Sequence, residues 1–434
     1  MKAYRATIID FAKNPQNDHS TPRYFEDGVL IVNRKGLIHK LGAYKDKELQ
    51  RELRSQKIPL TTYKNKIIMP GLIDVHLHFP QTEIIASYGE QLLTWLERYT
   101  FPTEGKFKNR KYGDVMAKIF FKELLRNGTT TAAIYGTVHP DSVEAMFSEA
   151  ARLNMRVLGG KVLMDRHAPD FLTDTPKRAY EESKRLIKKW HGHKRLSYAV
   201  TPRFAPTSTP EQLEMTAKLM QENPDVYLQT HLSENLSEIE WVKALFPSHK
   251  NYFDVYKAYG LVGRKCLFGH AIHLSEGEWQ AMRASDSVIA FCPTSNLFLG
   301  SGLFKLRTAQ AHQLRVGVAT DVGGGTSFSM IKTLSDAYKV IQLQGENLSA
   351  LEGFYLATLG GARALGLDNY IGNFDEGQEA DFIVVDPKAT PIQKLRDDHA
   401  DSNIAERLFA LMILGDDRSI YETYIQGKRA HSRD

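Results

Sequence analysis

The chain has few cysteines and no long apolar run. Two of its 434 residues are cysteines, Cys266 and Cys292, too few for the disulfide framework of a small secreted protein. Both lie in apolar, strand-like segments, where buried and unreactive thiols are common. The longest purely apolar run, 408–414, falls far short of the roughly 18 residues that a membrane-spanning helix needs. These absences predict a cytoplasmic protein without a membrane partner.

The charge of the chain is nearly balanced. Its 56 basic and 51 acidic residues leave a formal net charge of +5, and the lysine runs, such as Lys188-Lys189, are short. Such runs are typical of solvated helix faces, so we expect no nucleic-acid partner. Hydrophobic residues make up 42% and aromatic residues 10%, which is close to the average of folded soluble domains. The composition predicts a globular protein with a large core.

From residue 67 onward, short β-rich runs alternate with helical patterns. This alternation is typical of βαβ units built around a parallel sheet. Eight parallel strands, each followed by a helix, close a barrel, so the sequence predicts the α/β fold class and a (β/α)₈ TIM barrel. The eight runs cover residues 67–79, 129–137, 155–166, 196–204, 226–234, 266–274, 287–296 and 315–324.

The two ends of the chain have a different pattern. Residues 1–66 and 371–434 contain strand and turn sequences, with no helix evident between 371–386 and 421–429. We therefore expect both ends to form one small β-sandwich domain beside a catalytic barrel of residues 67–370.

Two histidines on the first barrel strand have the spacing of a chelating pair. Residues i and i+2 of a strand face the same side, so His76 and His78 point together. Chance alone gives about half an H-x-H pair in a chain of this composition, so the spacing is weak evidence by itself. A second pair, His191 and His193, lies in a lysine-rich stretch ahead of a strand and is interpreted as a solvated loop.

Three further polar residues strengthen the first pair. His231 closes the fifth predicted strand, His270 lies on the sixth, and Asp321 closes the eighth. Each alone is more typical of a satisfied buried polar residue. Together they lie toward the barrel face that carries catalysis in such enzymes. Imidazole and carboxylate donors favour Zn²⁺, with Fe²⁺ as the alternative, because no nearby thiolate demands a softer metal.

The set also contains groups that can move protons. Glu234 follows His231 by three residues, just beyond the strand end, although a surface glutamate starting a helix would look the same. A metal that lowers the pKa of water, a base that takes its proton and a carboxylic acid that delivers one together make hydrolytic chemistry. The sequence therefore predicts a hydrolase.

Three residues suggest the shape of the substrate. Arg203 ends the fourth predicted strand and offers only donors, which suits oxo or ring-nitrogen acceptors. Phe204 could stack on a planar ring, although a lone phenylalanine is more often part of a core. Gln81 offers both donors and an acceptor, like an amide edge. A planar heterocycle with a carbonyl group fits this set better than a peptide or a sugar.

Several motifs together resemble the amidohydrolase superfamily, and within it the barrel-type guanine deaminases. They are PGLIDVHLHFPQ, TPRF, HLSEN, CPTSN and TDVGGGTSF, and the likeness spans nearly the whole chain. Segments outside the site, including LLTWLERYTFP at 92–102, also resemble that family and carry the substrate assignment. One departure is GHAIHL, where relatives often have Ala before His270 and Cys after it; the ligand set stays intact.

The resemblance implies one zinc ion per chain and a set of residue roles. The metal ligands would be His76, His78, His231 and Asp321. His270 would position the attacking water, and Glu234 would shuttle protons. Zinc-bound hydroxide would attack C2 of guanine while Asp321 accepts the water proton and Glu234 protonates the ring nitrogen and the departing amine, giving xanthine and ammonia. The purine contacts would be His78, Gln81, Arg203, Phe204, His231, Glu234 and Asp321. The resemblance also suggests a homodimer.

Three alternatives remain open at this point. A two-metal hydrolase of cyclic amides would need a bridging lysine, and Lys161 on the third predicted strand is a candidate. Another aminopurine or a triazine could be the substrate. A non-enzymatic barrel is disfavoured, because every expected ligand is present. The long connection after the first strand, within 80–128, could form a lid over the pocket.

Overall fold

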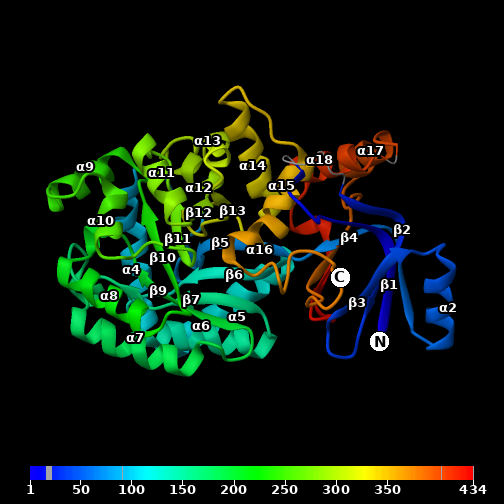
Figure 1. Ribbon diagram of the computed structural model, residues 1–434, viewed down its shortest axis with the longest axis horizontal. Helices are drawn as coiled ribbons and strands as arrows, with labels where there is room; N and C mark the ends of the chain where they lie inside the picture. Colours follow the sequence, from blue (N-terminus) through cyan, green and yellow to red (C-terminus); the bar gives the residue numbers. More distant parts are fainter. Residues whose placement is uncertain (16–21, 90, 402, 434) are drawn as a thin grey trace.

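The computed structural model describes residues 1–15, 22–89, 91–401 and 403–433 and contains two sheets. The larger sheet forms a nearly closed barrel of eight parallel strands, which confirms the predicted fold class (Figure 1). A short extra strand, β8 (Val162–Leu163), pairs with β9. The barrel strands are β5 (Leu72–His78), β6 (Thr129–Tyr135), β7 (Arg156–Gly160), β9 (Leu196–Pro202), β10 (Tyr227–Leu232), β11 (Cys266–His270), β12 (Val288–Phe291) and β13 (Arg315–Val318).

Two backbone hydrogen bonds just beyond β13 join the last strand to the first. The Asp321 amide donates to the His76 carbonyl at 2.9 Å, and the His78 amide donates to the Val322 carbonyl at 2.6 Å. The segment that carries Asp321 is therefore tied directly to the strand that carries the two histidines.

Helices surround the barrel, and their apolar faces pack on the strands (Figure 1). The start of helix α8 shows how these helices are capped: Thr209 accepts a hydrogen bond from the Gln212 backbone amide, and Pro210 takes the first helical position. The helices are α5 (Arg110–Arg126), α6 (Pro140–Leu153), α7 (Pro176–Trp190), α8 (Pro210–Glu222), α9 (Leu236–Leu245), α10 (Tyr252–Ala258), α11 (Glu276–Ala284), α12 (Pro293–Phe298), α13 (Leu306–Ala311), α14 (Met330–Gln342), α15 (Ala350–Leu356) and α16 (Leu359–Leu365), with short 3₁₀ turns at Asp170–Leu172, Ala205–Thr207 and Asp417–Ser419.

The second sheet combines strands from both ends of the chain, as the sequence predicts, and both termini lie beside it (Figure 1). It is one continuous seven-stranded sheet in the order β16-β15-β14-β4-β1-β2-β3, where the sequence predicted a sandwich. The helix α2 (Lys47–Ser55) buries Leu49 and Leu53. The strands are β1 (Lys2–Asp10), β2 (Arg23–Val32), β3 (Ile38–Ala43), β4 (Leu60–Pro70), β14 (Phe382–Val385), β15 (Ile420–Ile425) and β16 (Lys428–Ser432).

The predicted strand 67–79 is two strands in the structure. Gly71 separates β4, which belongs to the small sheet, from β5, which belongs to the barrel. A side chain at Gly71 would place its Cβ 2.1 Å from Oγ1 of Thr130, so the close passage between the two sheets requires glycine. The division into 1–66 with 371–434 and 67–370 stays a prediction, and β4 crosses its first boundary.

Two helices lie between β14 and β15, where the sequence predicted none. They are α17 (Pro391–His399) and α18 (Ile404–Leu414). Thr390 and Gln393 form a capping box at the start of α17. The apolar run 408–414 belongs to α18 and buries Leu408, Leu411 and Met412 in the main core.

The connection after β5 is largely helical. It begins with a 3₁₀ turn (Phe79–Ile84) and continues through α3 (Leu92–Trp95), a π-helical turn (Leu96–Thr100), α4 (Phe101–Gly105) and a 3₁₀ turn (Lys106–Lys108). A π-helical turn inside α-helix is uncommon and often accompanies a functional site.

No helix among the described residues is long and apolar enough to cross a membrane.

Candidate active site

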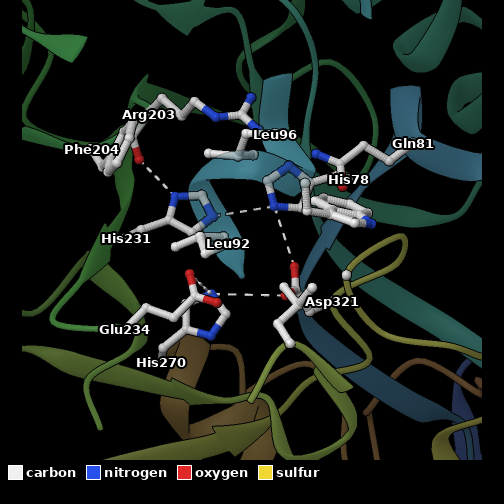
Figure 2. A pocket seen from close by; sticks show the side chains of 13 residues that line it. His78, Gln81, Leu92, Leu96, Arg203, Phe204, His231, Glu234, His270 and Asp321 are labelled. Atoms are coloured by element: carbon white, nitrogen blue, oxygen red, sulfur yellow. Dashed lines mark hydrogen bonds and ion pairs between the residues drawn. The ribbon is translucent and has the colours of Figure 1, made fainter. Parts of the chain in front are cut away.

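A pocket opens at the carboxyl ends of the barrel strands, and the predicted site residues converge on it (Figure 2). His76 is the exception: it is almost fully buried behind the pocket and does not line it. All the other residues that the sequence singled out for the site line it directly. The lining consists of His78, Gln81, Leu92, Trp95, Leu96, Arg203, Phe204, His231, Glu234, His270, Leu299, Asp321 and Gly324.

Three histidines and one aspartate form a compact buried cluster. The ligand-type atoms of His76, His78 and His231 lie within 4.8 Å of one another. Oδ1 of Asp321 lies 3.3 Å from Nε2 of His76 and 3.3 Å from Nε2 of His78. Gly269 on β11 makes room for this packing, because a Cβ there would come within 2.7 Å of the His76 ring.

The protonation states of the cluster suit a cation. Burial is the main reason that the pKa values of His76 and His231 fall below their usual range, and it lowers the pKa of His78 to about 3. Burial alone would raise the pKa of Asp321, but interactions with His76 and His78 outweigh it and hold that pKa well below its usual range. The cluster therefore offers neutral imidazoles and an ionised carboxylate, the forms that bind metals.

Hydrogen bonding fixes which nitrogen of His231 faces the cluster. Nδ1 of His231 lies 2.6 Å from the Arg203 carbonyl oxygen, which can only accept, so this nitrogen carries the proton. The Nε2 lone pair therefore points at Nε2 of His78, 3.3 Å away. Nε2 of His76 is buried without a hydrogen-bond partner among the described residues. Lone pairs converging on one point fit a divalent cation there.

Cys292 lies nearer to this cluster than the sequence suggested. Its Sγ and the ligand atoms of His76, His270 and Asp321 also lie within 4.8 Å of one another. Burial raises the pKa of the Cys292 thiol well above its usual range, so the sulfur keeps its proton. A protonated thiol is a poor ligand, which leaves the histidines and Asp321 as the favoured donors.

His270 and Asp321 both have a left-handed backbone, with φ of 68° and 50°. Residues other than glycine rarely adopt this conformation, and it concentrates at functional sites. Nδ1 of His270 lies 2.9 Å from Oδ1 of Asn296, which directs Nε2 into the pocket. There Nε2 lies 3.4 Å from Glu234 and 3.8 Å from Asp321.

Glu234 is buried and holds a proton readily. Burial is the main cause and the charge of Asp321 the second, and together they raise the pKa of Glu234 to about 8. Oε1 of Glu234 accepts a hydrogen bond from the Ser301 hydroxyl at 3.2 Å. The Glu234 backbone amide donates to Oε2 of Glu238 at 2.9 Å, so the capping box of α9 also holds this residue. Such a carboxyl group can act as a general acid near neutral pH.

Three of the predicted substrate contacts, Arg203, Phe204 and Gln81, line the pocket next to strand ends. Arg203 and Phe204 directly follow β9, and Gln81 lies in the 3₁₀ turn after β5. Nη1 of Arg203 donates to both oxygens of Glu104, at 2.9 and 3.0 Å. Nε2 of Gln81 donates to Oε1 of the same glutamate at 3.1 Å.

Sequence reasoning missed several pocket residues. They are Leu92, Trp95 and Leu96 from the helical connection after β5, and Leu299 and Gly324 from loops after α12 and β13. Two family-like stretches contain four of them: LLTWLERYTFP at 92–102, which was placed outside the site, and TDVGGGTSF, which includes Gly324. These stretches marked the segments without indicating which side chains face the pocket.

The second histidine pair and the candidate bridging lysine both lie away from the pocket. His191 ends α7 and accepts a hydrogen bond from the Tyr198 amide, and His193 is exposed, so this pair does not line the pocket. The Lys161 ammonium group is fully buried and pairs with Asp174 and Glu182. Lys161 does not line the pocket, which removes the support for a bridging lysine.

Comparison with known proteins gives consistent matches. The model of the amidohydrolase family matches residues 67–430. Guanine deaminase of Escherichia coli K12 is 51% identical over 436 residues, covering 100% of this chain and 98% of that protein. Human guanine deaminase is 36% identical over 379 residues, covering 84% of this chain and 83% of its own.

Solved structures give the same relation. The structure of E. coli guanine deaminase superimposes with a TM-score of 0.96, covering all of both chains. A guanine deaminase from C. acetobutylicum, solved with bound guanine in its active site, superimposes with a TM-score of 0.88 at 30% identity, covering 99% of each chain.

Proposed function

This chain belongs to the amidohydrolase family and, within it, to the guanine deaminases, and we propose that it hydrolyses guanine to xanthine and ammonia with one divalent metal ion, Zn²⁺, per chain. The observation that carries the residue assignment is the convergence at one pocket of three neutral imidazoles with an ionised aspartate, a protonatable glutamate and a buried arginine. We also propose a cytoplasmic homodimer, on family likeness.

The metal would be held by His76, His78, His231 and Asp321. A divalent ion in this position would lower the pKa of water and so supply a hydroxide nucleophile near neutral pH. The short distances from Asp321 to His76 and His78 and the fixed tautomer of His231 support this assignment. Zinc is preferred because imidazole nitrogens and a carboxylate are its usual ligands.

The proton transfers would fall to residues on the floor of the pocket. Asp321 accepts the proton of the attacking water, and His270, whose Nε2 faces Asp321 and Glu234, orients that water. Glu234, which keeps its proton up to about pH 8, protonates the ring nitrogen next to C2. It then takes the remaining proton of the added hydroxyl group and passes it to the departing amine, and the proton held by Asp321 finally restores Glu234. The two carboxyl groups have opposite pKa shifts, as one acid and one base require.

Arg203 and Gln81 would recognise the polar edge of the purine, and Phe204 its face. Nη1 of Arg203 donates to Glu104, and the other N–H groups of the guanidinium have no acceptor among the described residues. They suit the C6 carbonyl of guanine. His78, His231, Glu234 and Asp321 would contact the reacting side of the ring, since they line the same pocket.

Replacing Arg203 with alanine is expected to lower kcat/KM for guanine about 10–100-fold, the range for losing a hydrogen bond to a charged group. Zinc content should stay near that of the unchanged protein, because Arg203 reaches the cluster only through its backbone carbonyl. Steady-state kinetics and metal analysis check this, with Arg185→Ala on the exposed face of α7 as the control. Unchanged guanine kinetics would remove Arg203 from the site.

The rate is expected to fall as pH rises through the pKa of Glu234. A general acid must hold its proton, and the raised pKa keeps Glu234 protonated only below about pH 8. A bound cation favours the carboxylate, so the falling limb of kcat should lie at or below pH 8. A profile of kcat from pH 5 to 10 measures this limb, and a rate still rising at pH 9 would contradict the assignment.

The direct test of the proposed function is ammonia release by zinc-loaded protein from guanine, with adenine and cytosine as parallel substrates. Rapid release from guanine alone is expected, because only guanine places a C6 carbonyl beside a 2-amino group. Release from adenine or cytosine but not from guanine would overturn the proposed substrate.

A further inference from the structure

One completely buried glutamate lies behind the pocket and touches two of the proposed substrate contacts. Glu104 is on α4 and does not line the pocket. Its carboxylate accepts from Nη1 of Arg203 through both oxygens and from Nε2 of Gln81 through Oε1. The connection after β5, which carries Gln81 and Glu104, and the end of β9, which carries Arg203, therefore meet on one carboxylate.

The contacts of Glu104 determine how Gln81 is oriented. Oε1 of Gln81 accepts from the Gly323 amide at 3.2 Å, while its Nε2 donates to Glu104. A carboxylate can only accept and a backbone amide can only donate, so the reversed orientation of the Gln81 side chain would break both bonds. One Nε2 proton then remains for a ligand, and its direction is fixed.

Glu104 also balances the charge of Arg203 and orients its side chain. Arg203 is 3% exposed, so its charge needs a partner, and its only side-chain hydrogen bonds within the described residues go to Glu104. Phe101, also on α4, places its ring 5.8 Å from the centre of the guanidinium. The pair leaves the remaining guanidinium donors facing the pocket.

We propose that Glu104 is the positioning residue that sets the purine specificity of this site, by holding Arg203 and Gln81 so that both present donors to a carbonyl-bearing ring edge. The inference rests on the proposed function. Glu104 does not touch the substrate and acts through the other two side chains. This alignment should raise the affinity for a ligand with a C6 carbonyl and leave the affinity for a purine without one unchanged.

The test compares two ligands that differ at this edge. Hypoxanthine carries the C6 carbonyl, purine lacks it, and neither has an amine to release. Binding constants are measured by calorimetry on zinc-loaded unchanged protein and on Glu104→Gln, which keeps the size and removes the charge. The Kd of hypoxanthine should rise about tenfold or more, and that of purine less than about threefold.

A matched control lies at the other end of the same strand. Asp381 pairs with Arg195. Arg195 directly precedes β9 and Arg203 directly follows it, so at the rise of an extended strand the two arginines lie about 25 Å apart. Both members are buried. Asp381→Asn should lower the unfolding midpoint without changing the ratio of the two Kd values. If Glu104→Gln does not fold, Glu104→Asp is used instead. It should weaken the binding of hypoxanthine alone, and by a smaller factor, because aspartate keeps the negative charge on a shorter side chain.

The outcomes separate this inference from the proposed function. Unchanged protein that neither releases ammonia from guanine nor binds hypoxanthine overturns both. Active protein whose Glu104 variants bind hypoxanthine normally, or lose both ligands equally, overturns the positioning role alone. A loss confined to hypoxanthine supports it.

Discussion

Replacing Glu234 with glutamine is expected to lower kcat for guanine by about 10²–10⁴, the usual contribution of a general acid–base group. The amide keeps the size of the side chain but cannot exchange a proton. Glu234 is not among the cluster donors, so zinc should stay bound at the level of the unchanged protein. The expected result is therefore a metal-loaded and folded protein that is nearly inactive.

The control for this variant is Glu240→Gln on α9, the helix that begins just after Glu234. Glu240 is exposed and pairs with Lys243 at 3.9 Å, so its loss should leave kcat and metal content unchanged. Zinc analysis and ammonia release on both variants complete the experiment. A Glu234→Gln protein that binds zinc and turns guanine over at the normal rate would rule out the proton-transfer role.

Asp321→Asn is expected to reduce both metal occupancy and turnover, the latter at least about 10³-fold, because one change removes a ligand and the proton acceptor. Asp321 is the carboxylate that lies 3.3 Å from both His76 and His78. Its replacement by a neutral amide leaves the imidazoles without the negative charge that balances a cation. This double loss distinguishes Asp321 from Glu234, whose variant should lose turnover alone.

Asp225→Asn is the matched control, since Asp225 precedes β10 and its side chain is 88% exposed. It should bind zinc and turn over guanine normally. Full zinc occupancy in Asp321→Asn would show that the histidines alone hold the metal, and Asp321 would then lose its place among the ligands.

The part of the site that follows strand periodicity could be predicted from the sequence. His76 and His78 lie two residues apart on β5 and so face the same side. Arg203, His231 and Asp321 each lie at or just after a strand end. Because parallel strands of a barrel bring their carboxyl ends to one face, residues far apart in the chain meet there.

The remainder of the site depends on tertiary placement. Glu104 lies in YTFPTEGK, where a glutamate near a lysine is typical of solvent-exposed helix, and only the packing of α4 against the end of β9 buries it beside Arg203. Trp95 and Leu299 look like ordinary core residues by pattern. Gly71 was not recognised as a strand break, because the apolar pattern runs through it without interruption.

We propose that one metal ion in the His/Asp cluster supports hydrolysis of guanine. Zinc is titrated into metal-free protein, and ammonia release from guanine is measured at each addition. Activity should be negligible without metal, rise linearly and saturate at one equivalent per chain. Saturation only at two equivalents, or full activity in metal-free protein, would contradict it.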